Sequence, residues 1–176
     1  VPVEDQIRAI EELVRIDREW IPRVSGASLY IRPAMIATES ALGVHPSTDY
    51  LYFIVTGPVG AYYARGFEPV SILVEENYIR ATRGGLGEAK TGANYAASIL
   101  AAKEAKKKGF DQVLWLDAER RRFVEEVGTM NIFFVFGDRL VTPALSGSIL
   151  PGVTRDSVLQ LARTLNLKPE ERAISI

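Results

Sequence analysis

The residue in this sequence best suited to covalent chemistry with a carbonyl compound is a lysine in a glycine-rich segment. Lys90 stands between Gly87 and Gly92, in the run Arg-Gly-Gly-Leu-Gly-Glu-Ala-Lys-Thr-Gly-Ala-Asn-Tyr from Arg83 to Tyr95. Glycines allow positive φ and let a ligand approach the main chain. A lysine amine can form a Schiff base with a carbonyl group, the bond on which pyridoxal phosphate chemistry depends. The segment therefore favours a reactive amine, with a solvated surface lysine as the alternative.

Two further motifs have the chemistry to complete a site around such an amine. Glu126, in Glu-Val-Gly-Thr-Met-Asn, is a carboxylate that can pair with a pyridinium nitrogen and favour its protonated state. The Pro-Gly-Val-Thr turn ending at Thr154 precedes an expected helix, whose first N–H groups and positive dipole end can hold a phosphate. Each motif has a structural alternative, because Glu126 also suits a capping or surface role and Thr154 also suits an N-cap.

Composition excludes several other kinds of site. The 176 residues include no cysteine and one histidine, His45, which excludes disulfides, thiolate metal sites and multi-histidine metal sites. A net charge of -1 gives no electrostatic case for a nucleic-acid partner. No apolar run approaches the roughly 20 residues of a membrane helix, and no signal peptide opens the chain. We therefore expect a cytoplasmic globular protein with no metal, nucleic-acid or membrane partner.

The hydrophobic pattern predicts mixed helices and strands around these motifs. The stretch 57–67 is the densest in glycine and proline and is expected to connect two domains. An amphipathic helix over 3–20 precedes it, and Asn94 and Thr154 are expected to open two later helices, which end near Gly109 and before Pro169. The predicted strands cover residues 28–37, 50–56, 69–74, 78–82, 113–116, 132–136 and 139–142.

Six motifs, in order along nearly the whole chain, resemble those of the branched-chain amino acid aminotransferases, which are pyridoxal-phosphate enzymes of fold type IV. The order makes the resemblance more specific than any single motif. The motifs are Leu29-Tyr30-Ile31-Arg32-Pro33, Gly57-Pro58-Val59-Gly60-Ala61-Tyr62, Gly84-Gly85 through Lys90 to Asn94-Tyr95, Gln112-Val113-Leu114-Trp115-Leu116, Glu126-Val127-Gly128-Thr129-Met130-Asn131 and Leu150-Pro151-Gly152-Val153-Thr154-Arg155.

The resemblance implies a role for each matching residue. Lys90 is expected to form the Schiff base with pyridoxal 5'-phosphate and to move the proton, Tyr95 to bind the phenolic oxygen of the cofactor, and Glu126 to meet its pyridine nitrogen. The other cofactor contacts expected are Leu150 on the ring face and the N–H groups of Val153 and Thr154 on the phosphate. The residues expected at the substrate are Tyr30, Arg32, Tyr62 and Thr129.

The resemblance also implies an α/β fold of the α+β type. Residues 1–56 are expected to be the C-terminal part of a small domain, 57–68 the interdomain linker, and 69–176 the first half of a larger pseudo-barrel domain that binds the cofactor. Family members are longer, with an N-terminal phosphate-binding arginine and a C-terminal small-residue turn that this sequence lacks. We therefore expect a fragment with uncovered apolar surface and strand edges, prone to associate.

The expected activity is transamination of leucine, isoleucine and valine with 2-oxoglutarate, in a homodimer or higher homo-oligomer. A D-amino acid aminotransferase or an aminodeoxychorismate lyase is the alternative within fold type IV. A catalytically silent folding or association unit is the alternative from another class.

Overall fold

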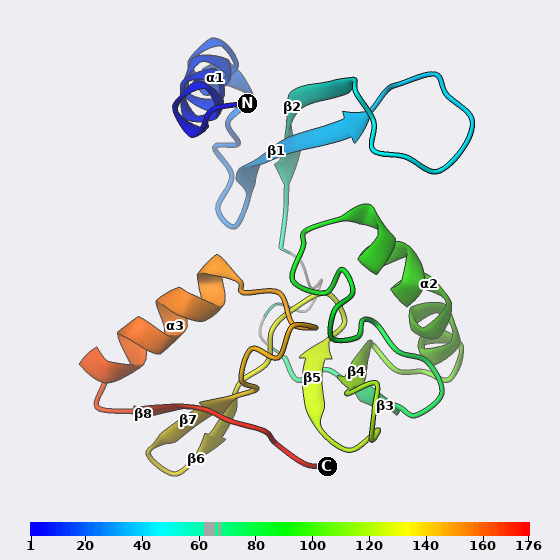
Figure 1. The fold of residues 1–176 in the computed structure, drawn as a ribbon. Helices are drawn as coiled ribbons and strands as arrows, with labels where there is room; N and C mark the ends of the chain where they lie inside the picture. Colours follow the sequence, from blue (N-terminus) through cyan, green and yellow to red (C-terminus); the bar gives the residue numbers. More distant parts are fainter. Residues whose placement is uncertain (62–65, 67) are drawn as a thin grey trace. The chain divides into compact units, whose positions relative to one another are not determined.

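The computed structural model describes residues 1–61, 66 and 68–176 and divides into two compact units, Val1–Glu68 and Pro69–Ile176 (Figure 1). Both units combine helices with strands, as the sequence predicts for an α/β protein. The assignment of the units to a small domain, a linker and a larger domain stays a prediction.

The first unit is a helix followed by a long β-hairpin. α1 (Val3–Ile16) and the 3-10 turn η1 (Arg18–Trp20) precede β1 (Ser28–Ala37) and β2 (Tyr50–Val59). The two strands are antiparallel, with Ser28 opposite Val59 and Ala37 opposite Tyr50. β2 runs three residues beyond the strand expected at 50–56. None of the described residues of this unit is buried, and Trp20 is 69% exposed, so the unit has no hydrophobic core of its own.

The second unit contains two three-stranded sheets. In the first, β4 (Gln112–Leu116) lies between β3 (Ile72–Glu75), to which it is parallel, and β5 (Val124–Val127), to which it is antiparallel. In the second, β7 (Arg139–Thr142) lies between β6 (Phe134–Phe136), its antiparallel neighbour, and β8 (Lys168–Glu171), its parallel neighbour.

Each parallel pair is connected through a helix. α2 (Gly92–Lys107) leads from β3 to β4 and packs on β4, and α3 (Val153–Thr164) leads from β7 to β8 and packs on β8 (Figure 1). A parallel pair needs such a crossover, because the chain must return to the same end of the sheet. The Lys90 segment enters α2, and the Pro-Gly-Val-Thr turn enters α3.

The side chains of β4 alternate between the two faces of the sheet, and both faces are covered. Val113 and Trp115 point toward α2 and pack on Ala101 and Ala105, while the alternate leucines pack on the other face. The core on that other face consists of Leu114, Leu116, Val124, Val127, Val141 and Ile174. Val141 belongs to the second sheet, so this core joins the two sheets.

Several predictions of local structure are wrong. Residues 78–82 form no strand, and β5 and β8 are strands that the pattern did not indicate. α2 begins at Gly92 after an N-cap at Thr91, so Asn94 lies within the helix rather than at its N-cap. The buried side of α2 carries the small residues Asn94, Ser98, Ala101 and Ala105, while Ile99 and Leu100 are exposed.

Enlarging Ala101 is expected to destabilise the second unit. Ala101 has no exposed surface and faces Trp115, so Ala101→Leu forces extra methylene groups into a filled space and is expected to lower the free energy of unfolding by about 1–3 kcal/mol. Ala97→Leu, at an exposed position of the same helix, is the control and is expected to change it by less than about 0.5 kcal/mol. Urea unfolding measures both, and equal effects would contradict the packing described.

Candidate active site

Lys90 follows a tight glycine turn that the next helix holds in place. Gly84 has φ +76°, a conformation that favours glycine, and Ala89 N–H donates to Leu86 O at 2.9 Å. The buried amide of Asn94 donates to two carbonyl oxygens of this turn, Leu86 O at 2.6 Å and Ala89 O at 2.9 Å. The side chain of Asn94, at the start of α2, therefore holds the backbone that leads to Lys90.

Gly87 allows this turn to pack against a segment distant in sequence. A Cβ atom at Gly87 would lie 2.2 Å from the backbone oxygen of Ser148, closer than any real contact. Only glycine therefore fits there without moving the backbone, and the Lys90 turn and the 146–150 segment touch directly.

The Lys90 side chain is exposed and lies beside Tyr95. Its Nζ is 5.6 Å from the centroid of the Tyr95 ring, within the range of a cation–π contact. The two residues are five apart and come from the turn and from α2. The predicted amine and the predicted phenol are therefore neighbours in the structure.

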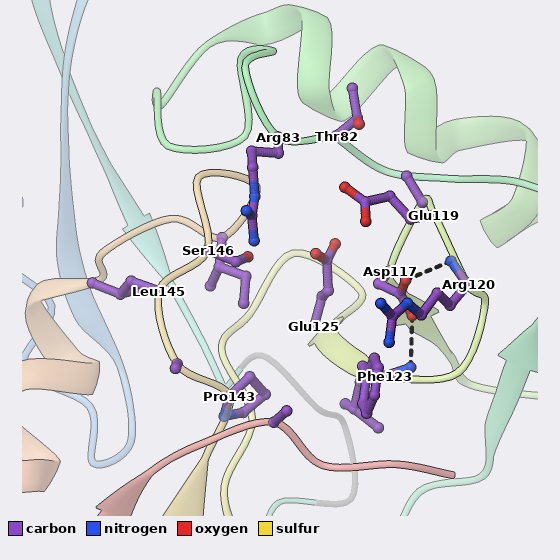
Figure 2. Close-up of a pocket in the computed structure, with 15 residues that line it drawn as sticks. Thr82, Arg83, Asp117, Glu119, Arg120, Phe123, Glu125, Pro143, Leu145 and Ser146 are labelled. Carbon is purple, nitrogen blue, oxygen red and sulfur yellow. Dashed lines mark hydrogen bonds between the residues drawn. The ribbon is translucent and has the colours of Figure 1, made fainter.

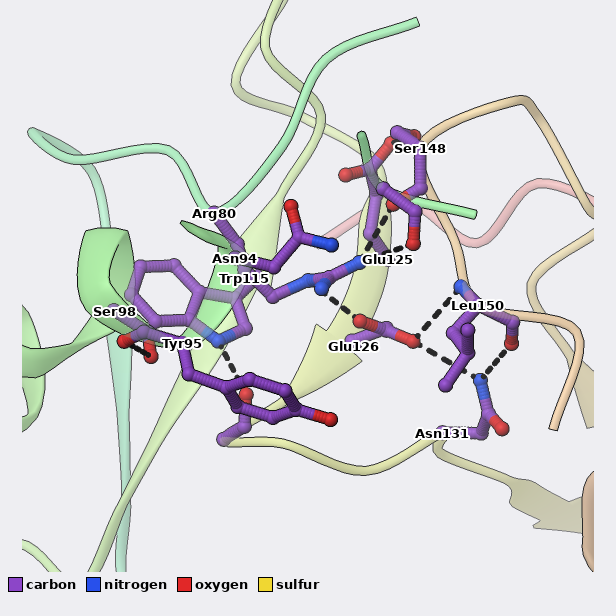
Figure 3. A network of polar contacts seen from close by, with 12 residues as sticks. Arg80, Asn94, Tyr95, Ser98, Trp115, Glu125, Glu126, Asn131, Ser148 and Leu150 are labelled. Carbon is purple, nitrogen blue, oxygen red and sulfur yellow. Dashed lines mark hydrogen bonds and ion pairs between the residues drawn. The ribbon is translucent and has the colours of Figure 1, made fainter. Parts of the chain in front are cut away.

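Glu126 is the most strongly perturbed carboxyl group of the site. It lies on β5 with its side chain 4% exposed, and its Oε2 is 2.5 Å from Nε of Arg80. Its Oε1 accepts from Asn131 Nδ2 at 3.1 Å and from the Leu150 N–H at 3.3 Å (Figure 3). Burial raises the pKa of Glu126 from its ordinary value of 4.5 to about 7, although the Arg80 charge and the Leu150 hydrogen bond lower it. The alternative interpretation of Glu126 as a surface carboxylate is therefore wrong.

The segment from Leu150 to α3 is held to Glu126 and to the second sheet. Asn131 Nδ2 also donates to Leu150 O at 2.9 Å. α3 begins at Val153 after an N-cap at Gly152 with no side-chain cap, so Thr154 is not the N-cap. Val153 and Thr154 are exposed, and buried Arg155 donates to Pro143 O at 3.0 Å. The first N–H groups of α3 therefore lie at a helix end that Arg155 anchors.

Several of the predicted residues line one small pocket. Tyr95, Glu126, Thr129 and Leu150 are among its lining residues, and Ala89 brings the backbone next to Lys90 to its edge. Other lining residues are Arg80, Asn94, Ser98 and Gly128. The enclosed space is small, so a ring-sized ligand can lie only at its mouth.

The predicted substrate residues fall outside this second unit, apart from Thr129. Tyr30 and Arg32 lie on β1 of the first unit, where Arg32 Nη2 donates to the Tyr30 hydroxyl at 2.5 Å. Tyr62 lies outside the described residues. Their placement near Lys90 stays a prediction.

A larger cavity of about 480 Å³ lies beside β5 (Figure 2). It is lined by Arg83, Asp117, Arg120 and Glu125, together with apolar side chains. Glu125 and Glu126 are successive residues of β5, so their side chains point to opposite faces, one toward this cavity and one toward the small pocket. Burial raises the pKa of Glu125, which accepts a hydrogen bond from Ser148 Oγ.

Sequence reasoning missed Arg80 and Asn131 as parts of the site. Neither has a spacing that indicates chemistry, and both contact Glu126 through segments that only the fold brings together. The signal available for Asn131 was its place in the Glu126 motif. For Arg80, it was its position shortly before the glycine run.

The chain therefore combines an α/β fold with a site that contains Lys90, Tyr95 and the buried carboxyl group of Glu126. The profile of the family described as amino-transferase class IV matches residues 4–176. The chain belongs to this family, and its structural neighbours identify the fold as fold type IV.

The chain is also similar to individual proteins that are named as branched-chain amino acid aminotransferases. The chain is 53% identical to a probable branched-chain-amino-acid aminotransferase of Streptomyces coelicolor, aligned over 100% of this chain and 49% of that protein. It is 51% identical to branched-chain-amino-acid transaminase 1 of Bacillus subtilis, over 99% and 50%. The chain spans about half the length of these curated relatives.

Among solved structures, the branched-chain amino acid aminotransferase of Escherichia coli superposes with a TM-score of 0.82 at 27% identity, over 99% of this chain and 56% of that one. The Thermobaculum terrenum enzyme, solved in its PLP-form, gives a TM-score of 0.78 at 29% identity, over 99% and 55%. No helix in the described part of the chain is both long enough and apolar enough to cross a membrane.

The raised pKa of Glu126 is expected to make stability depend on pH. The folded chain holds this proton more tightly than the unfolded chain, so the stabilisation is fully present below pH 4.5 and is lost as the pH rises to about 7. Glu126→Gln cannot titrate, so its stability relative to the wild type is expected to rise between pH 4.5 and 7.

Urea unfolding at about pH 4.5, 6 and 7.5 measures this difference. Glu76→Gln, at an exposed position, is the control and is expected to show a smaller change with pH. A stability difference between Glu126→Gln and the wild type that is the same at all three pH values would rule out the raised pKa.

Proposed function

We propose that this chain forms the cofactor-binding part of a branched-chain-amino-acid aminotransferase, which uses pyridoxal 5'-phosphate to transfer the amino group of leucine, isoleucine or valine to 2-oxoglutarate. The observation that carries the proposal is the pocket that Tyr95, Glu126 and Leu150 share beside Lys90. The names of the relatives support the substrate class.

The residues present fit this cofactor by their chemistry. Glu126 offers a buried carboxylate to a pyridinium nitrogen, and Leu150 offers an apolar side chain to a ring face. The N–H groups of Val153 and Thr154 at the start of α3 suit a phosphate group. When bound through a lysine amine, pyridoxal phosphate supplies an electron sink for the substrate carbon.

The remaining steps belong to side chains of this chain. Lys90 provides the amine for attachment and, once free, accepts and returns the proton at the substrate carbon. With pyridoxal phosphate bound, the Tyr95 hydroxyl would donate a hydrogen bond to its phenolic oxygen, and the negative charge of Glu126 would favour a protonated ring nitrogen. Thr129 is the residue of this pocket proposed to face the substrate carboxylate.

The substrate pocket is proposed to include Tyr30, Arg32 and Tyr62. Aromatic side chains form an apolar wall that selects an aliphatic substrate by shape and desolvation. One methylene group is worth only about 1–3 kcal/mol, so discrimination among leucine, isoleucine and valine is expected to be weak. The absence of cysteine from the sequence fits the cytoplasmic location that we also propose.

The spectrum of the chain with pyridoxal phosphate tests the assignment of Lys90. We expect a visible absorbance band that moves away from that of the free aldehyde, and we expect Lys90→Ala to abolish it because no other lysine adjoins the pocket in the described part of the chain. Lys103→Ala, at an exposed position of α2, is the matched control and should keep the band. A band that survives in Lys90→Ala would refute the assignment.

We also propose a homodimer or higher homo-oligomer, because the first unit exposes hydrophobic side chains. Exposed hydrophobic side chains of this unit include Trp20, Tyr50, Leu51 and Val55. Sedimentation velocity is expected to give a mass of at least two chains at about 50 μM, and a compact monomer at that concentration would contradict the proposal.

A further inference from the structure

We propose that Arg80 is a positioning residue of the cofactor site, whose guanidinium lies against the Glu126 carboxylate at the mouth of the pocket and favours its ionised form against the opposing effect of burial. The inference rests on the proposed function, because an ionised Glu126 matters for catalysis only if a pyridinium nitrogen lies against it. The contact between the two side chains is independent of any cofactor.

The side chain of Arg80 is buried where three segments meet (Figure 3). Its side chain is 8% exposed, and its Nε lies 2.5 Å from Glu126 Oε2 on β5. Its Nη2 donates to Ser148 O at 2.6 Å and lies 3.5 Å from Gly87 O in the turn before Lys90. One guanidinium therefore joins the Glu126 strand to the 146–150 segment and reaches the Lys90 turn.

The two oxygens of Glu126 are held by different partners. Arg80 contacts Oε2, and Asn131 and the Leu150 N–H both donate to Oε1. Of these three partners, Arg80 alone carries a charge. Asn131 and Leu150 therefore orient the carboxylate by hydrogen bonds, whereas Arg80 places a positive charge beside it and favours its ionised state.

Other titratable groups near Glu126 do not replace this charge. Glu125, its neighbour on β5, favours the protonated form by repulsion. Tyr95 from α2 lines the pocket, and Lys90 lies against the Tyr95 ring at the edge of the same site. A carboxylate buried without a paired cation becomes protonated, and a protonated Glu126 cannot stabilise a pyridinium.

Titration of Glu126 in the cofactor-free chain tests the proposal directly. The side-chain carboxyl resonances of 13C-labelled glutamate are followed with pH, and Glu126→Gln identifies the resonance of Glu126. In Arg80→Met the ionisation midpoint of Glu126 is expected to rise by about 1–3 pH units, the effect of removing an adjacent opposite charge. Arg83→Met, in the same segment but lining the larger cavity, is the matched control and should leave the midpoint in place.

A midpoint in Arg80→Met equal to that of the wild type would overturn the proposal. If Arg80→Met does not fold, the double variant Arg80→Met/Glu126→Gln decides. Folding of the double variant supports the proposal, because the defect then lies in an unpaired buried carboxylate. Failure of the double variant as well would overturn it, because the role of Arg80 would then be independent of Glu126.

Cofactor binding gives a second readout that separates this inference from the proposed function. With pyridoxal phosphate at about pH 8, Arg80→Met is expected to bind roughly tenfold more weakly than Arg83→Met, and equal affinities would contradict a role at the cofactor. If the wild-type chain binds no pyridoxal phosphate, the proposed function fails, while the titration of Glu126 still decides whether Arg80 sets its charge.

Discussion

A buried ion pair between Arg80 and Glu126 is the constraint around which the second unit is arranged. Removing a carboxylate from water costs several kcal/mol, and a partner with good geometry must offset that cost. Arg80 supplies the charge, and Asn131 and the Leu150 N–H supply the hydrogen bonds to the other oxygen. Arg80 lies before the glycine turn, Asn131 before β6 and Leu150 after β7. These three segments must therefore come together for β5 to be buried.

This arrangement explains how separate motifs become one site. The carbonyl of Ser148 accepts from Arg80 and touches Gly87, so the ion pair and the Lys90 turn share a neighbour. Asn131 bonds both Glu126 and Leu150, which places the carboxylate next to the turn that opens α3. The cofactor contacts proposed above would require Glu126, Leu150 and the start of α3 to lie near one another, and these contacts hold Glu126 and Leu150 together.

The residues proposed for the site are easier to find in the sequence than the elements that hold them. Lys90, Tyr95 and Glu126 stand out by residue type and spacing, and Leu150 by the family resemblance alone. Tyr95, Glu126 and Leu150 line one pocket. β5 escaped prediction because its sequence, Val-Glu-Glu-Val, places two buried carboxylates in the middle of the strand. β8 escaped because Lys-Pro-Glu-Glu is polar and contains proline, which suits only its position at the edge of the sheet. Residues 78–82 look like a strand, but tertiary contacts of Arg80 and a hydrogen bond from Arg121 to Tyr78 O hold them in an irregular path.

Lys90 is proposed to be the amine to which pyridoxal phosphate becomes attached, and the proposed function depends on this attachment. Reduction with borohydride after addition of the cofactor fixes such an attachment irreversibly, and peptide mass spectrometry locates it. A single major phosphopyridoxyl label is expected on Lys90 in the wild-type chain. A label on another lysine, such as Lys103 or Lys106, or no label at all, would contradict it.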